Sequence, residues 1–217
     1  MEEMMKLIST YGLALVIVGL LLYFAVQYVL VHLEDYKQKR NIKKHDELAT
    51  LRNQISSAVE AVIERTLLRT RASRVYVFEF HNGSTSMGGL PFLKMTNTYE
   101  ALGEGAKSER HKRAAMPMQL YSSFVDAIYN KEYLVINTNN RTDEYSKLVY
   151  ETLAERDIST IVCAKLMDIN RRVIGYLGID YCNEKPVEES IIQESVRIAQ
   201  DVAVELGALL SVNKRKG

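Results

Sequence analysis

The most apolar stretch of the chain is GLALVIVGLLLYFAVQYVLV, residues 12–31, which holds no charged side chain. Twenty helical residues that rise about 1.5 Å each span about 30 Å, the thickness of a hydrocarbon core. This pattern predicts a transmembrane helix over 12–33 after an N-terminal tail over 1–11, with the lipid bilayer as a partner.

The flanking charges give that helix a direction. A single basic residue, Lys6, precedes it, and several follow it: Lys37, Lys39, Arg40, Lys43, Lys44 and Arg52. Because basic residues gather on the cytoplasmic side of single-pass proteins, we expect a protein of the inner or plasma membrane whose soluble domain lies in the cytoplasm.

Between Glu34 and about Thr70 the chain has no Pro and no Gly, and apolar residues recur at helical spacing. One interpretation is that this stripe packs on the following domain. The other is a parallel coiled-coil seam that makes a homo-oligomer. Both interpretations hold if the N-terminal half of the helix pairs with another copy and its C-terminal half packs on the domain. We expect a helical linker over 34–50 and a seam at four positions: Leu48, Leu51, Ile55 and Val62.

Beyond residue 70 the pattern alternates as strands do. RVYVFEFH (74–81) and FLKMTNTYE (92–100) flank a Gly-rich loop, and STIVCAKLM (159–167) and VIGYLGIDY (173–181) flank a polar turn, so each pair predicts a hairpin. Between them we expect further elements: helices over 116–130 and 142–157 and a strand over 132–137. A last helix begins near Pro186. This order predicts an α+β fold with a central antiparallel sheet flanked by helices over 51–212, followed by a basic tail over 213–217.

Composition narrows the function. Lys and Arg number 28 and Asp and Glu 27, so the net charge of +1 gives no reason to expect nucleic acid as a partner. The 4 His lack ligand spacing and the 2 Cys form no Cys-x-x-Cys, so we expect no metal and no cofactor. With the turn centred near Asn170, Cys163 faces residue 177 and Cys182 points to the opposite face, so we expect both thiols to be reduced.

No Gly-x-Ser-x-Gly elbow, P-loop or dinucleotide fingerprint occurs, so we expect no enzymatic activity. The candidate site is the loop that opens with His81-Asn82-Gly83. It is either the bend that ends a strand, or a binding loop that covers the sheet's concave face and contacts an unknown small molecule or protein. The residues of that second interpretation are His81, Asn82, Gly83, Lys94, Tyr99 and Glu100.

The closing pattern, an apolar strand, a polar turn, VIGYLGIDY and a link with Pro186 into a long helix, resembles GAF-type sensory domains, relatives of PAS. The resemblance covers roughly 51–212 and implies a domain that binds a small ligand or a protein partner. Asn130-Lys131 lacks the continuation found in cyclic-nucleotide-binding members, and Cys163 lacks the motif around the cysteine of bilin-binding members.

A second pattern resembles the T-type holins of T-even bacteriophages. It consists of the early strand Val75-Tyr76-Val77-Phe78 and the late hairpin and helix over 159–210, behind one N-proximal apolar helix. This resemblance implies a protein that permeabilises the inner membrane to time host lysis, with an outer domain bound by an antiholin. We keep it as the alternative to a membrane-anchored sensor.

Overall fold

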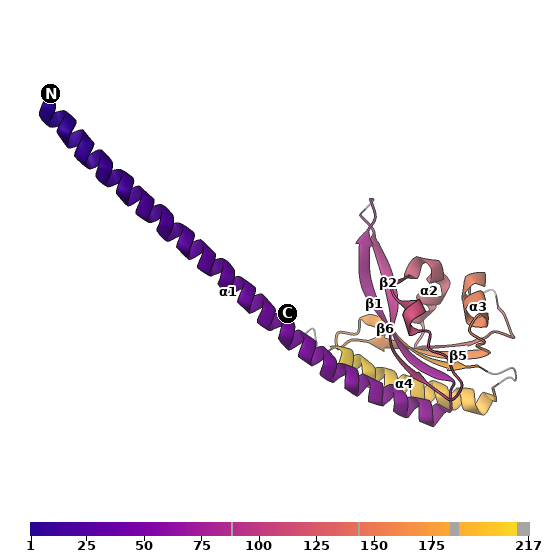
Figure 1. Ribbon diagram of the computed structural model, residues 1–217. Coiled ribbons are helices and arrows are strands. Elements are labelled where there is room, and N and C mark those ends of the chain that lie inside the picture. Colours follow the sequence, from indigo (N-terminus) through magenta and orange to yellow (C-terminus); the bar gives the residue numbers. More distant parts are fainter. Residues whose placement is uncertain (88, 143, 183–186, 212–217) are drawn as a thin grey trace. The chain divides into compact units, whose positions relative to one another are not determined.

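A computed structural model covers residues 1–217 and describes the chain except residues 88, 143, 183–186 and 212–217 (Figure 1). In the N-terminal helix, the side chains of residues 2, 4–10, 12–17, 19, 44, 45 and 48 also lie outside the described part. The chain divides into two units, Met1–Leu51 and Arg52–Gly217. Helix α1 (Glu2–Thr70) supplies the first unit and begins the second.

In the part of the chain that the structure describes, no helix has a stretch long and apolar enough to cross a membrane. The expected transmembrane helix over 12–33, and with it the single-pass membrane localisation, is therefore contradicted.

The second unit is built on one six-stranded sheet whose neighbouring strands are all antiparallel, in the order β3-β2-β1-β6-β5-β4. The strands are β1 (Arg74–Thr85), β2 (Pro91–Leu102), β3 (Met116–Pro117), β4 (Tyr133–Asn137), β5 (Thr160–Met167) and β6 (Val173–Tyr181). The expected α+β class and both predicted hairpins are confirmed.

Helices cover both faces of this sheet (Figure 1). The end of α1 and helix α4 (Glu189–Ser211) lie side by side on one face, and the Arg65–Glu205 ion pair of 2.9 Å joins them. The other face carries α2 (Ser122–Asn130), α3 (Lys147–Ala154) and the 3₁₀ turns η1 (Arg110–Arg113) and η2 (Met118–Tyr121). We call these the helical face and the pocket face.

Strand β1 contributes to both layers because its side chains alternate. Val75 and Val77 are buried toward the helical face, whereas Tyr76 and Phe78 belong to the aromatic core on the pocket face. A central strand covered on both sides reads as a nearly continuous apolar run, which is why VYVF occurs here.

The stripe expected as a dimer seam falls partly inside the domain. Ile55 and Val62 are buried in the second unit. At these two positions the stripe therefore packs on its own domain. Leu51 is half-buried, and the side chain of Leu48 lies outside the described residues. Pairing through residues 34–50 stays a prediction.

Two predicted helices are shorter than expected. Residues 116–121 form β3 and η2, so the helix expected over 116–130 begins at Ser122. The helix expected over 142–157 begins at Lys147, behind an extended Ser146 in the N-cap position. The expected helix start at Pro186 lies outside the described residues.

The predicted register of the β5–β6 hairpin was wrong by one residue. Cys163 lies opposite Gly178, and Leu177 opposite Ala164, because the pairing shifts at an irregularity between Leu166 and Met167. A slip of one residue turns every side chain to the other face, so Cys163 and Cys182 both lie against the aromatic core on the pocket face. Both thiols are free, as expected.

Candidate functional site

The structure places His81, Asn82 and Gly83 inside β1 rather than at its end. They lie beyond the last pairing of β1 with β6, at Glu79–Gly175, and are exposed. The bend expected at Asn82 is therefore wrong, and the chain turns later, where Gly89 has a φ of 82°. The distal hairpin projects beyond the sheet instead of covering its concave face (Figure 1).

Glycine at position 83 has a local reason. A Cβ there would lie 2.3 Å from the carbonyl oxygen of Phe92 on the paired strand, too close for any other side chain without a shift. His81 is held by a 2.8 Å hydrogen bond between its Nε2 and the Thr96 hydroxyl. This part of the candidate site is thus a tightly paired ribbon.

The remaining predicted site residues separate onto two faces. Lys94 pairs with His81 across the hairpin. Tyr99 is buried on the helical face with its hydroxyl 3.0 Å from Ser56 Oγ. Glu100, the next residue, points to the other face and accepts a 2.6 Å hydrogen bond from Ser108. The structure brings His81 and Lys94 together but does not gather the predicted residues into one pocket, and their contact with a ligand stays untested.

A buried charged cluster, absent from the sequence expectations, lies on the pocket face. Asp180 of β6 is fully buried, and its Oδ2 lies 2.9 Å from Arg156 Nη2 and 3.4 Å from Arg74 Nε. The Tyr76 hydroxyl donates a 2.8 Å hydrogen bond to its Oδ1. Segments distant in sequence therefore meet at one carboxylate, beside the aromatic core.

Burial sets the ionisation of this cluster. It raises the pKa of Asp180, and the attraction of Arg156 and Arg74 offsets part of that rise. Burial also opposes the charge of Arg156, but Asp180, Tyr76 and Tyr176 together outweigh it, and the pKa of Arg156 is raised. Burial and the repulsion of Arg156 lower the pKa of Arg113, which reaches the cluster from η1. The site is one in which positive charge is in excess.

Arg113 and Arg156 share a small cavity with the aromatic core; we call this place the arginine–aromatic pocket. The cavity volume is about 30 Å³, room for a water molecule or two. Phe78 stacks on Tyr176 with ring centroids 5.0 Å apart, and Phe124 meets Tyr176 edge-on at 5.2 Å. Aromatic side chains therefore fill most of the space between the sheet and α2.

Two donors in this pocket have no acceptor. Among the described residues, the buried Nε–H groups of Arg113 and Arg156 find no hydrogen-bond partner. A buried donor left unpaired costs about 1–3 kcal/mol. Near Arg113 the nearest carboxylate is Glu109, 3.9 Å from its Nε. An anion entering the pocket would supply the missing acceptors.

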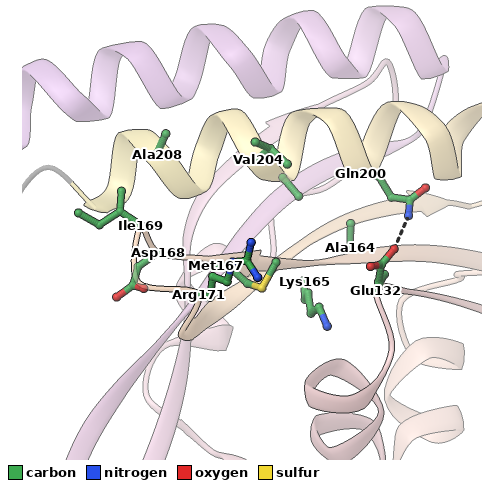
Figure 2. A pocket seen from close by; sticks show the side chains of 11 residues that line it. Glu132, Ala164, Lys165, Met167, Asp168, Ile169, Arg171, Gln200, Val204 and Ala208 are labelled. Atoms are coloured by element: carbon green, nitrogen blue, oxygen red, sulfur yellow. Dashed lines mark hydrogen bonds between the residues drawn. The ribbon is translucent and has the colours of Figure 1, made fainter.

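A second hollow lies between α4 and the β5–β6 hairpin (Figure 2). Its volume is about 390 Å³, and its walls are mostly apolar, with Met167 and Ile169 on one side and Val204 and Ala208 on the other. At its rim Gln200 donates a 3.5 Å hydrogen bond to Glu132. Unlike the arginine–aromatic pocket, it holds no buried unpaired donor among the described residues.

No group of three or more His, Cys, Asp or Glu side chains that could hold a metal ion occurs within the described part of the chain.

No family model and no curated protein matches this sequence. Solved structures do. A far-red cyanobacteriochrome photoreceptor matches with a TM-score of 0.55 and 12% identity over 83% of this chain and 99% of that one. The GAF domain of PixJ from Thermosynechococcus elongatus, in its blue-light-absorbing form, matches with a TM-score of 0.54 and 13% identity over 73% and 88%.

A phycocyanobilin-bound GAF domain from a cyanobacterial phytochrome matches with a TM-score of 0.52 and 14% identity, over 78% of this chain and 93% of that one. At such identities the similarity shows the fold alone. These matches give no support to the membrane anchor or to the holin resemblance. They confirm the expected architecture, and the second unit of this chain has a GAF-like fold.

Proposed function

We propose that the second unit is a non-enzymatic sensory domain that binds a small anionic ligand in the arginine–aromatic pocket. The observation that carries this proposal is the pair of buried Nε–H donors, on Arg113 and Arg156, that lack an acceptor beside a cavity. Each guanidinium has a carboxylate nearby, Asp180 for Arg156 and Glu109 for Arg113, yet its Nε–H makes no hydrogen bond. A ligand oxygen would remove the cost of these unmade bonds.

The aromatic side chains give the ligand its second property. Phe78 and Tyr176 line the cavity and are stacked nearly parallel, with 6° between their planes, and the Arg156 Cζ lies 5.3 Å from the centre of the neighbouring Tyr76 ring. A ligand with a planar apolar part and a carboxylate or phosphate would use both features. The similar GAF domain described as phycocyanobilin-bound supports ligand binding by this fold, but at 14% identity it does not identify this ligand.

Binding by this pocket is non-covalent in our proposal. Cys163 lies beside the aromatic core but is fully buried, and burial raises the pKa of its thiol. A thiol that stays protonated is a poor nucleophile. The anion is therefore held by guanidinium groups and ring faces rather than by a bond to sulfur.

The cavity of about 30 Å³ is smaller than any such ligand, so entry requires the pocket wall to move. Strand β6 carries Tyr176 and Asp180 on the pocket face and Tyr181 on the helical face. The Tyr181 hydroxyl donates a 3.2 Å hydrogen bond to the carbonyl of Thr70 in the last turn of α1. We propose that ligand entry shifts β6 and reaches α1 by this contact, and that α1 passes the change on through homo-oligomer contacts in residues 34–50.

The alternative function, a T-type holin, is favoured by no contact or surface among the described residues, and we do not carry it further.

A ligand panel tests the proposal. The melting temperature of the full chain is measured with phosphate, citrate and salicylate, each against sodium chloride of equal ionic strength. We expect at least one anion to raise it in the wild type and not in Arg113→Met. The matched control is Lys112→Met, because Lys112 is exposed beside Arg113 and carries the same charge. An equal response of Arg113→Met and the wild type to every anion would contradict the assignment.

A further inference from the structure

A surface cleft of about 330 Å³ lies between α1 and the η1 segment, next to residues 96–99 of β2, which follow the part of that strand paired with β3. It is distinct from the arginine–aromatic pocket, with which it shares no lining residue. The side chains that matter for its chemistry are Arg52, Asn97, Tyr99, Arg110 and His111.

Tyr99 brings two guanidinium groups together. The Arg52 Cζ lies 5.4 Å from the centre of its ring, and the Arg110 Cζ lies 6.0 Å from it. A hydrogen bond to Ser56 fixes the tyrosine hydroxyl. Two cations held near one ring repel each other, and an anion that contacts both would offset that repulsion.

The two arginines are not equivalent. Arg52 forms a 2.8 Å ion pair with Glu79, and that hydrogen bond raises the pKa of Arg52. In the described part of the chain the Arg110 guanidinium has no carboxylate partner, although Lys112 and Arg113 of the same turn both pair with Glu109. The unbalanced charge of the cleft therefore resides on Arg110, with His111 beside it.

A buried amide gives an independent indication. Asn97 lines the cleft at 1% exposure, and its Oδ1 has no hydrogen-bond partner among the described residues. Its Nδ2 donates to Glu100 at 3.4 Å, which fixes the oxygen as the unpaired atom. An acceptor oxygen beside two arginines fits a ligand that carries both anionic oxygens and a hydroxyl, as a monohydrogen phosphate does.

We propose that this cleft binds a phosphate group, either free phosphate or a phosphomonoester. Arg110 and Arg52 hold the anionic oxygens, and Asn97 accepts a hydrogen bond from the protonated one. The site stands apart from the proposed ligand pocket and does not depend on it.

The test titrates the full chain with inorganic phosphate by calorimetry at constant ionic strength. We expect Arg110→Gln to weaken phosphate binding at least about tenfold, which corresponds to one lost charge-assisted contact. Lys112→Gln removes the same charge from the same turn, at a side chain 77% exposed, and should change affinity less than about twofold. A parallel titration with glycerol 3-phosphate separates the sources, because tighter binding than phosphate identifies a phosphomonoester.

Three results would overturn the proposal. Equal weakening by both variants, or no saturable binding, would mean that phosphate is only attracted to a basic surface. Loss of phosphate binding in Arg113→Met with retention in Arg110→Gln would place the anion in the arginine–aromatic pocket instead. That outcome would leave the proposed function standing while removing the cleft site.

Discussion

Arg74 and Asp180 lie directly opposite each other in the register of β1 and β6, and their buried side chains form an ion pair of 3.4 Å. The pairing of the two central strands therefore also fixes the charged cluster. Arg156 joins the same carboxylate from the turn after α3, which ties the helix on the pocket face to the sheet.

Asp180→Asn should destabilise the domain strongly. The substitution leaves Arg74 and Arg156 buried without a counter-charge, and breaking a buried pair by removing one partner costs about 3–5 kcal/mol. Urea unfolding of the full chain measures the change. Asp201→Asn, on the exposed side of α4, is the matched control and should change stability by less than about 0.5 kcal/mol. A loss under about 1 kcal/mol for Asp180→Asn would show that the cluster is not a buried ion pair.

The turn between β5 and β6 should weaken in acid through Asp168. Hydrogen bonds from the backbone N–H groups of Arg172 and Asn170 hold the pKa of Asp168 below its usual value. Because the pKa of Asp168 is lower in the folded state, its carboxylate stabilises the fold at pH values above the ordinary aspartate pKa. This stability is lost as the pH falls through the lower pKa of the folded state. Wild type should thus be more stable than Asp168→Asn at pH 6, and the difference should shrink below about pH 4. A difference independent of pH would contradict this.

Gly178→Ala should strain the aromatic core. A Cβ at position 178 would lie 2.4 Å from the ring of Tyr76, which is buried and has no room to move. Overpacking of this kind costs about 1–3 kcal/mol. In a Tyr76→Leu background the same substitution should cost much less, so a double-mutant cycle of unfolding free energies measures the contact. Additive effects of the two substitutions would count against it.

Tyr181→Phe should loosen the connection between β6 and α1. It removes the hydroxyl that donates to the Thr70 carbonyl and lies 2.5 Å from Ser195 Oγ. We expect a loss of about 1 kcal/mol and faster amide exchange in the last turn of α1. Exchange as slow as in the wild type would mean that the contact does not couple the two elements.

The hairpins, the terminal helix and the GAF-like order were predictable because apolar alternation and turn residues are local signals. The register of β5 and β6 was not, since the irregularity between Leu166 and Met167 leaves no mark in the pattern. This shift of the register by one residue determines the face of the sheet on which Cys163 lies. The apolar run over 12–33 predicted a membrane helix, which the described residues contradict.

The buried charged cluster beside the arginine–aromatic pocket could not be predicted from residue spacing, because Arg74, Arg156 and Asp180 meet only through sheet register and the return of the chain after α3. One signal was present. Asp180 stands in VIGYLGIDY, the single charge in an otherwise apolar strand, and such a charge implies a buried partner. His81-Asn82-Gly83 was conspicuous for its residue types, yet Gly83 is explained by its close approach to Phe92.

The central claim is that Arg113 and Arg156 hold an anionic ligand, and co-purification tests it most directly. Wild type, Arg113→Met and Lys112→Met are purified without denaturant from one expression host, and bound small molecules are released and identified by mass spectrometry. We predict one anionic compound, near one per chain, in the wild type and in Lys112→Met but not in Arg113→Met. The same compound at the same level in all three proteins, or none in the wild type, would contradict the account.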